Sequence, residues 1–329
     1  MILDDSKFGV RELSIAINQL PTTPSIIRSL GVFKPEYLRT TYAEVEYQEG
    51  KISLVPTKER GMGGVPVAPK NRLVRTFKVP HLPIHDVIRA DDVQNLRAFG
   101  TTSQLETVAN VVNDKLADAK QQLEYTREHM ALGALMGKIL DADGSVLFDL
   151  NDEFKIERKE HVFNLSDNKA DVGKLIDKVK TAQAKEAKGE PVTGYIVLAS
   201  EAFMQAVIYH NSVKEPYMHY QASSQYKDKD NTHVEFNFKG VKFIQYDHLF
   251  ESGETIADGE AIWLPAGTRN AFREFFAPAD MNATVNTKAL AYYASREKLE
   301  HDKGWSLHCQ SNPLPMVCRP DMVATLKLG

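Results

Sequence analysis

Two histidines and one aspartate make up the segment of this sequence that is best suited to chemistry. They are His81, His85 and Asp86, with His85 four residues after His81. Imidazole nitrogens and carboxylate oxygens bind divalent metal ions, and residues four apart on a helix would share one face. Pro80 and Pro83 instead favour an extended chain, because proline fixes its own backbone and restricts the residue before it. A metal-dependent enzyme that uses His81 and His85 is therefore kept only as a minor alternative.

Other motifs for catalysis or cofactor binding are missing from the sequence. It has no phosphate-binding P-loop, dinucleotide-binding glycine motif, zinc-protease motif or serine-nucleophile motif. The cluster Gly61–Gly64 leads into a proline-rich run instead of a helix N-terminus, so it lacks the backbone donors that hold phosphate. Cys309 and Cys318 do not have the spacing of a zinc module. We expect two buried free thiols, with Pro313, Pro315 and Pro320 marking a turn between two strands. We therefore predict no catalytic, metal-binding or cofactor-binding residues.

The composition is typical of a protein with a sizeable packed core. The chain has 329 residues, of which 43% are hydrophobic and 26% charged, and its formal net charge is −4. This length suffices for two domains or one elongated body. Its apolar runs are far shorter than the roughly 20 residues that span a membrane, and its first residues lack the basic start of a signal peptide. With only two cysteines as well, we expect a protein that folds in the cytoplasm and makes no membrane contact.

Opposite charges are concentrated in two segments of the chain. Residues 51–89 hold eight basic and two acidic residues, whereas residues 141–160 hold seven acidic and three basic residues. Phe77 is the only aromatic residue in the first segment, and nucleic-acid grooves interleave basic with stacking aromatic residues, so sequence-specific binding of DNA or RNA is not expected. We expect the two segments to form a contact between subunits, unless both are ordinary solvated surface. The candidate contact residues are Lys58, Arg60, Lys70, Arg72, Arg75, Asp149, Asp152 and Glu153.

A long helix is predicted over residues 103–140. Ser103 and Glu106 form a capping box at its start, and apolar residues then recur mostly at three-, four- or seven-residue steps. Gly144 marks its end, because glycine adopts the left-handed conformation that ends helices. At about 1.5 Å per residue the helix would be roughly 55 Å long. Its polar residues follow no sustained heptad, which favours a helix across the back of a sheet-containing domain over a coiled coil or a bundle.

Residues 1–40 indicate an arm. A short helix over 10–20 and an apolar patch over 26–33 are separated by Pro21 and Pro24. Two short amphipathic pieces cannot bury themselves. Each therefore needs a surface to lie on, in the same subunit or in a neighbour.

Residues 41–90 indicate a long projecting loop. Alternating strands over 42–48 and 73–79 flank a tip at 61–69 that is rich in glycine and proline. Such a tip suits neither a helix nor a central strand. We expect a second copy of the chain to supply the partners that keep this loop ordered.

The rest of the chain alternates strands and helices. The predicted elements are a hairpin over 146–156 around Asn151 and Asp152, a helix over 170–188, a strand over 195–199 with Ser200 as the N-cap of the next helix, a polar loop over 221–232, a hairpin over 234–246, a strand over 261–265, and closing strands over 305–308 and 323–328. Together with the long helix, this order predicts an α+β protein with an α/β second half.

The order of these parts, together with five stretches of sequence, resembles a known family. The stretches are Val79–Pro83 (VPHLP), Ile88–Asn95 (IRADDVQN), Gly194–Phe203 (GYIVLASEAF), Ala261–Thr268 (AIWLPAGT) and Gln310–Leu328 (QSNPLPMVCRPDMVATLKL). They resemble the major capsid proteins of tailed bacteriophages, and within these the lambda-type capsid protein E family with the Hong Kong 97 fold. The resemblance covers nearly the whole chain.

The resemblance implies a division of the chain into four parts. These are an N-terminal arm at 1–40, an extended β loop at 41–90, a peripheral domain at 91–190 and 286–329 that holds the spine helix at about 103–140, and an axial domain at 191–285. Shell expansion would bend the spine helix, and Gly133 and Gly137 are the expected places for that bend, since glycine in a helix interior costs about 1 kcal/mol relative to alanine.

The resemblance also implies a function and partners. Hexamers and pentamers would build an icosahedral shell around double-stranded DNA, assembled in the host cytoplasm and found in the virion. The other expected partners are a separate scaffold protein, a portal and, as in many relatives, a decoration protein. On this basis the protein is structural and not an enzyme. An encapsulin-type compartment with the same fold is the main alternative.

Overall fold

The computed structural model describes residues 9–21, 25–48, 72–93, 108–224 and 234–329. The contacts among these residues divide the chain into two compact units. Unit 1 comprises the described residues of Met1–Glu44, Thr76–Ala131 and Arg273–Met316, and unit 2 those of Val45–Arg75, Leu132–Phe272 and Val317–Gly329. Each unit is thus assembled from segments that lie far apart in the sequence, and each has its own core.

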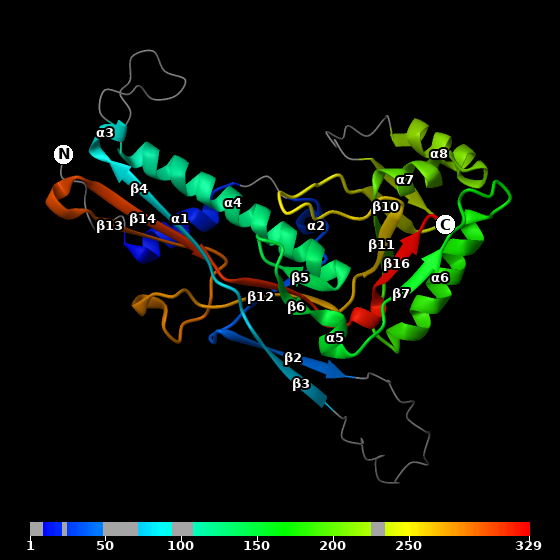
Figure 1. Ribbon diagram of the computed structural model, residues 1–329, viewed down its shortest axis with the longest axis horizontal. Helices are drawn as coiled ribbons and strands as arrows, with labels where there is room; N and C mark the ends of the chain where they lie inside the picture. The colour runs from blue at the N-terminus through cyan, green and yellow to red at the C-terminus, as the bar shows by residue number, and fades with distance from the viewer. Residues whose placement is uncertain (1–8, 22–24, 49–71, 94–107, 225–233) are drawn as a thin grey trace, which may run out of the picture. The chain divides into compact units, whose positions relative to one another are not determined.

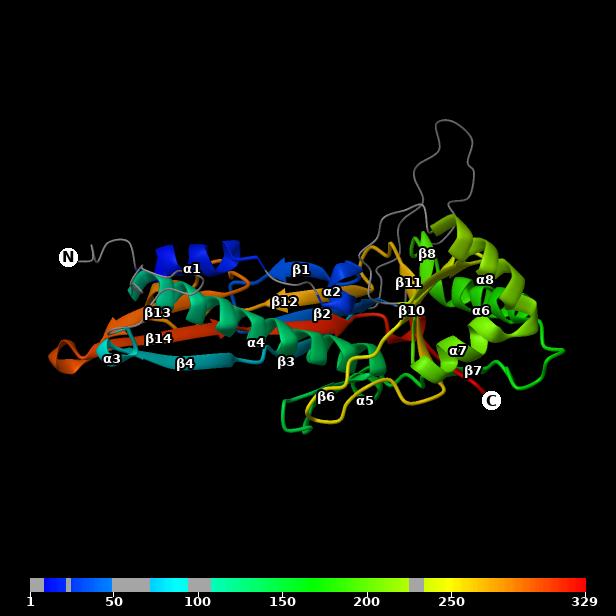
Figure 2. The same ribbon diagram turned by 90° about the horizontal axis from the view of Figure 1, so that it is seen from above.

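Unit 1 contains a three-stranded antiparallel sheet covered by two helices. Its strands, in the order β13–β14–β4, are Tyr293–Lys298, Gly304–Ser311 and Leu82–Arg89, and the helices are α1 (Val10–Gln19) and the long α4 (Val108–Met136). Leu13 and Ile17 of α1 share one buried cluster with Leu116 and Leu123 of α4 and with Leu307 of β14. Figures 1 and 2 both show α1 and α4 running along this sheet. The predicted arm therefore lies, in its described part, on its own subunit.

A second sheet of unit 1 has the order β1–β12–β15. Its strands are Lys34–Tyr37, Phe272–Phe276 and Pro313–Val317, and β1 runs parallel to β12. The turn that we predicted from Pro313, Pro315 and Pro320 is wrong for the first two, because both lie in β15, whereas Pro320 begins a 3-10 turn. An edge strand accepts prolines two residues apart, since their missing N–H groups share the side that faces no neighbour.

Unit 2 is built around a six-stranded mixed sheet in the order β7–β16–β11–β8–β10–β9. The strands are Lys159–Val162, Ala324–Lys327, Glu260–Ala266, Gly194–Ala199, Val241–Gln245 and Glu235–Phe238. Three helices pack on one face: α6 (Val172–Ala187), α7 (Glu201–Tyr209) and α8 (Asn211–Ser224). Val197 and Trp263 project from that face into the same core as Ile176 of α6 and Phe203 of α7. The sheet and its helices thus include residues on both sides of residue 191, where we expected the axial domain to begin, and that domain boundary stays a prediction.

Several elements of unit 2 match the sequence-based expectations. The strand before Ser200 is β8, and the Ser200 hydroxyl accepts a hydrogen bond from the Phe203 N–H at the start of α7. The predicted helix over 170–188 is α6, capped by Asp171. The hairpin over 234–246 is β9 paired with β10. The polar loop predicted from residue 221 is partly wrong, because α8 continues to Ser224.

The long helix ends earlier than the sequence predicted. α4 ends at Met136, Gly137 has a left-handed φ of 97°, and the chain returns as the hairpin β5 (Lys138–Leu140) and β6 (Val146–Asp149). Ile139 continued the helical spacing of apolar residues, but it is a buried strand residue. Gly144, with φ 82°, lies in the hairpin connection and not at a helix end.

The predicted hairpin over 146–156 is wrong. Residues Leu150–Phe154 form a short helix, α5, whose first turn contains Asn151 and Asp152. The two polar residues that resembled a turn are the N-terminus of this helix.

The two strands of the predicted loop are present. β2 (Tyr42–Gln48) pairs with β3 (Arg72–Lys78) as a separate two-stranded sheet (Figure 1). The tip at 61–69 lies outside the described residues. The remaining short elements are the helices α2 (Ile26–Ser29) and α3 (Ala90–Val93) and the 3-10 turns Asn282–Thr284, Glu300–Asp302 and Pro320–Met322. In the described part of the chain, no helix is both long and apolar enough to cross a membrane.

Candidate assembly site

Two of the predicted contact residues meet within one chain. The Arg75 guanidinium of β3 lies 2.6 Å from the Glu153 carboxylate of α5, and it also lies 5.8 Å from the centre of the Phe154 ring. Both charged side chains are partly exposed, and such pairs contribute roughly 0–1 kcal/mol. The β2–β3 ribbon is thus attached at the middle of β3 to α5 of its own subunit.

Asp149 serves the local fold. Its carboxylate accepts hydrogen bonds from the backbone N–H groups of Asn151 and Asp152 at 3.0 and 3.2 Å, which caps α5, and it lies 3.2 Å from the Lys138 ammonium. Burial alone would raise the pKa of Asp149, but the hydrogen bonds from Asp152 and Lys138 outweigh it and hold that pKa below its usual value. The Asp152 side chain is exposed.

The other basic residues predicted at the contact are outside the described part of the chain. Lys58, Arg60 and Lys70 lie outside the described residues, as does the side chain of Arg72 at the start of β3. A contact between these residues and a neighbouring subunit stays a prediction.

Gly133 and Gly137 occupy different settings. A Cβ on Gly133 would lie 2.5 Å from the Lys138 carbonyl oxygen, so glycine here lets strand β5 approach the last turns of α4. Gly137 follows the last residue of α4, so it ends the helix and is not inside it. Bending of the helix at Gly133 during a change of shape stays a prediction.

The segment from His81 to Asp86 is extended, as its prolines predicted. Four residues of strand span about 13–14 Å, which is too far for His81 and His85 to bind one metal ion. His81 Nδ1 lies 2.8 Å from Asn312 Oδ1, and Asp86 pairs with Lys115 at 2.7 Å. Among the described residues, no group of three or more histidines, cysteines or acids is placed to hold a metal.

Both cysteines are buried free thiols, as predicted. Burial, helped by the nearby Asp86 carboxylate, raises the pKa of Cys309 to about 12. A thiol in this state is protonated and unreactive at neutral pH.

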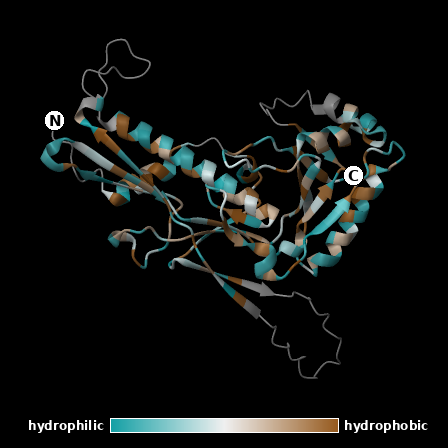
Figure 3. Cartoon of the chain, in the orientation of Figure 1, coloured by the Kyte–Doolittle hydropathy of each residue, from teal (hydrophilic) through white to brown (hydrophobic). Residues whose placement is uncertain are grey.

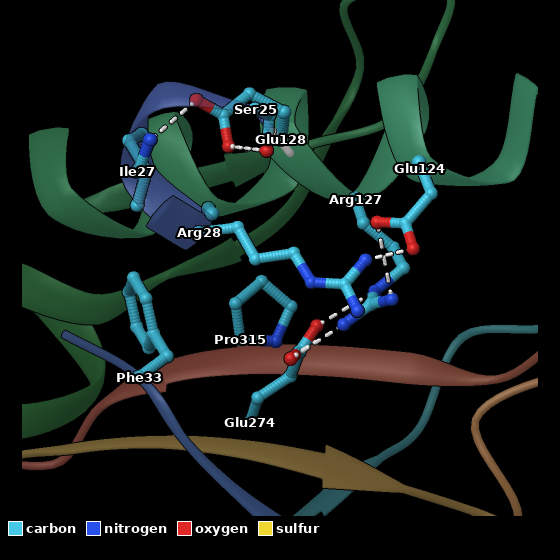
Figure 4. Close-up of a pocket in the computed structure, with 10 residues that line it drawn as sticks. Ser25, Ile27, Arg28, Phe33, Glu124, Arg127, Glu128, Glu274 and Pro315 are labelled. Atoms are coloured by element: carbon cyan, nitrogen blue, oxygen red, sulfur yellow. Dashed lines mark hydrogen bonds and ion pairs between the residues drawn. The ribbon is translucent and has the colours of Figure 1, made fainter. Parts of the chain in front are cut away.

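The feature that the sequence did not reveal is a buried polar stripe on α4. Lys120, Glu124, Arg127 and Glu128 are only 3–6% exposed. Figure 3 shows hydrophilic and hydrophobic residues interspersed along this helix. Figure 4 shows that the side chains of Glu124, Arg127 and Glu128 lie together with side chains from α2 and β12. We call Lys120, Glu124, Arg127 and Glu128 the α4 polar stripe.

Arg127 is the centre of this network. Its Nε and Nη2 donate to the two carboxylate oxygens of Glu274 on β12 at 2.9 and 2.7 Å, and its Nη1 lies 3.3 Å from Glu124. Nη1 also donates to the Tyr292 hydroxyl, which in turn donates to Glu124. Burial alone would lower the pKa of Arg127, but the Glu274 carboxylate and its hydrogen bonds raise it above the usual value. The charge is thus paired, and each guanidinium nitrogen has a hydrogen-bond partner, as a buried charge requires.

The ends of the stripe hold the N-terminal segment. The Lys120 ammonium donates to the Leu20 carbonyl at 2.6 Å, at the C-terminus of α1. The Glu128 carboxylate accepts from the Ile27 N–H at 2.8 Å and from the Ser25 hydroxyl at 2.5 Å, at the N-terminus of α2. A cation thus meets the negative end of one helix and an anion the positive end of the next.

One sequence signal could have indicated this arrangement. Lys120, Glu124 and Glu128 follow one another at four-residue steps, so they lie on one side of α4. Arg28 of α2 pairs with the middle one, Glu124. Charged residues at such steps are usually solvated, so the spacing alone did not distinguish a buried stripe of charges from a solvent-exposed one.

A hollow of about 870 Å³ opens in unit 1 beside the start of β2 and the end of β3. Its lining includes Tyr42, Lys78, Met281, Val285 and Asn312. Tyr42 and Val285 are 50% and 63% exposed. Apolar groups exposed around a hollow are typical of surfaces that other proteins cover.

Comparisons with known proteins give one consistent result. Residues 9–328 match the family described as phage major capsid protein E. The major capsid protein of Salmonella phage Felix O1 (isolate Felix O1-VT1) is 25% identical over 358 residues, covering 98% of this chain and 97% of that protein. The major capsid protein of Pseudomonas phage KPP10 is 26% identical over 340 residues, covering 97% and 96%.

Solved structures share the fold at low sequence identity. The putative capsid protein of a prophage of E. coli CFT073 matches with a TM-score of 0.60 and 10% identity, over 98% of this chain and 99% of that one. The subunit of the mature capsid of bacteriophage PhiM1 matches with a TM-score of 0.51 and 10% identity, over 94% and 89%. The α+β fold of the Hong Kong 97 type, which the sequence resemblance implied, is thereby confirmed.

Proposed function

This chain belongs to the phage major capsid protein E family, and we propose that its copies assemble as hexamers and pentamers into an icosahedral shell that encloses double-stranded phage DNA. As a phage shell protein, it is located in the virion capsid. The family match and both relatives are phage proteins, which favours this function over the encapsulin-type compartment.

The β2–β3 ribbon is the observation that carries the proposal of contacts between copies. Ala43, Val45 and Phe77 on one face of the ribbon are at most 3% exposed, whereas Tyr42 and Val74 on the other face are 50% and 52% exposed. In the described part of the chain no third strand joins this sheet. A two-stranded ribbon is marginally stable alone. Cover from a neighbouring subunit would bury Tyr42 and Val74 on its exposed face.

We also assign a role within the capsid subunit to each of the two units. The six-stranded sheet of unit 2 with α6, α7 and α8 is proposed as the axial domain, and the sheet of unit 1 with α4 as the peripheral domain. The described part of the arm is held by the α4 polar stripe of its own subunit. The arm is therefore positioned before any neighbour arrives.

The remaining partners are those that the sequence resemblance implied. We propose a separate scaffold protein, a portal and a decoration protein as partners, and contact with DNA that does not depend on its sequence. We also propose that the chain has no catalytic role.

Electron microscopy with sedimentation tests the proposed assembly. The untagged chain, expressed with and without the scaffold protein encoded by the same phage, is expected to give closed shells or rings of five and six. Val74→Asp should fold normally, because its side chain is exposed, but should stay as a small species since a carboxylate would be buried at the contact. Val146→Asp on β6, 53% exposed in the native chain, is the control for an added charge on an exposed strand.

Two outcomes would contradict the proposal. One is that the native chain gives no particles even with its scaffold. The other is that Val74→Asp assembles as efficiently as Val146→Asp, which would show that the outer face of the ribbon is not covered.

A further inference from the structure

Two histidines from different strands lie opposite each other in unit 1. His85 of β4 and His308 of β14 are direct partners in the antiparallel register of the β13–β14–β4 sheet (Figure 1). Directly opposed residues have Cβ atoms about 4.5–5.5 Å apart. Their sequence neighbours Ile84, Leu307 and Cys309 pack into the core with α1 and α4. Since side chains alternate along a strand, both imidazoles project from the other face of the sheet.

Both imidazoles are accessible to a ligand. His85 is exposed, with Nε2 2.8 Å from Ser306 Oγ, and His308 is half-buried without a hydrogen bond to its ring in the described structure. Burial, together with the neighbouring His81 and His85, lowers the pKa of His308 below its usual value, against a smaller opposite effect of Asp280. Imidazole binds metal ions in its neutral form.

We infer that His85 and His308 together bind a divalent transition-metal ion of the class that prefers imidazole, such as Zn²⁺, Ni²⁺ or Cu²⁺. Metal–nitrogen bonds of about 2.0–2.1 Å place two ligand nitrogens roughly 3 Å apart, which two opposed imidazoles can reach by rotation of their side chains. The Ser306 hydroxyl lies beside the pair. Among the described residues no third histidine, cysteine or acid completes a cluster, so water fills the other positions.

A bound ion would join β4 to β14 by their side chains. β4 is the strand that follows the β2–β3 ribbon in the chain, so the ion would fasten the attachment of that ribbon to the sheet of unit 1. The inference rests on the strand register alone and does not depend on the proposed shell.

His81 supplies the matched control. It precedes β4 by one residue, is exposed, and has the same parity as His85, so it projects toward the same side. Its hydrogen-bond partner is the Asn312 side chain, with Nδ1 2.8 Å from Oδ1. An amide is a poor ligand for these ions. His81 influences His308 electrostatically, but His85 and not His81 is the direct partner of His308 in the strand register. His81 is therefore not placed to share an ion with His308.

The test is isothermal titration of the untagged full chain with NiCl₂ and with ZnCl₂. The chain has ten histidines, so variants identify the site. We expect one equivalent to bind, with at least tenfold weaker affinity in His85→Gln and in His308→Gln and unchanged affinity in His81→Gln. With Cu²⁺, the electron paramagnetic resonance spectrum should show coupling to two nitrogens in the native chain and to fewer in either variant.

Because His85 is exposed, His85→Gln should keep the fold. This variant therefore tests the metal site even if His308→Gln does not fold. The inference is overturned if no stoichiometric binding occurs. It is equally overturned if His85→Gln binds like the native chain, or if His81→Gln loses as much affinity as His85→Gln.

Discussion

Removing the Glu274 carboxylate should destabilise unit 1 far more than removing a neighbouring exposed carboxylate. Arg127 is 6% exposed and makes two of its hydrogen bonds to Glu274. Loss of one partner of a buried ion pair costs about 3–5 kcal/mol, because the other charge stays buried. Glu124, 3.3 Å from Arg127, offsets part of this, so we expect about 3 kcal/mol for Glu274→Ala.

The matched control is Glu36→Ala. Glu36 pairs at 2.6 Å with Arg273, the residue next to Glu274, but the two side chains are 43% and 33% exposed. Removal of such a pair costs roughly 0–1 kcal/mol. The two variants thus delete the same chemical group from the same sheet and differ mainly in burial.

Hydrogen exchange of α4 amides, followed by mass spectrometry on the unassembled subunit, measures the difference. Because 1.4 kcal/mol is a tenfold change, Glu274→Ala should speed exchange through opening of unit 1 by about 100-fold. The control should change it by about fivefold at most. In the double variant Arg127→Met with Glu274→Leu, most of the protection should return, since apolar residues can replace a buried pair. Equal exchange in Glu274→Ala and Glu36→Ala would refute the role assigned to Arg127.

Two further predictions concern α4 and the core of unit 1. Gly133→Ala should destabilise the subunit by about 1–2 kcal/mol in urea unfolding, because the close Lys138 carbonyl oxygen outweighs the gain of about 1 kcal/mol in helix propensity; a stabilised variant would exclude this close approach. Cys309, with its pKa raised to about 12, should react with thiol reagents at pH 8 only when the subunit opens. The folded chain favours the protonated thiol more than the unfolded chain does. The resulting contribution to stability is complete below the unfolded pKa of about 8.5 and is lost as pH rises toward 12. The free energy of unfolding should therefore fall more steeply over that pH range in the native chain than in Cys309→Ala.

Elements with a strong local pattern were predictable from the sequence. The helix over 172–187 has Val172, Ile176 and Val179 on one buried face and Asp171 as its cap. The strand β8 is an apolar run followed by Ser200, a good N-cap. In both places the local propensity and the burial in the folded chain agree.

Features that depend on distant partners were not predictable. Arg127 and Glu274 are 147 residues apart, and Arg28 and Glu124 are 96 apart. Nothing near α4 in the sequence shows that its charges are buried, because surface and buried charges have the same local spacing. The early end of α4 at Met136 had the same cause, since Ile139 fits a helix by its spacing and a strand by its tertiary contacts.

The candidate contact residues illustrate the same limit. The charge pattern predicted a contact between the basic and acidic segments of different copies, and in the described structure Arg75 and Glu153 meet within one chain. Net charge shows that two segments attract each other. It does not show whether they belong to the same copy.

The strand order of unit 2 has a consequence for synthesis on the ribosome. β16 lies between β7 and β11, so β7 meets this neighbour only after residues 163–323 have been made. Residues 132–272 are made between two parts of unit 1, and β16 follows after Met316 has completed unit 1. Pairing of such distant segments is slow. Each nascent chain therefore passes through a stage with unpaired edges on β7 and β11, which is the kind of surface that chaperones cover.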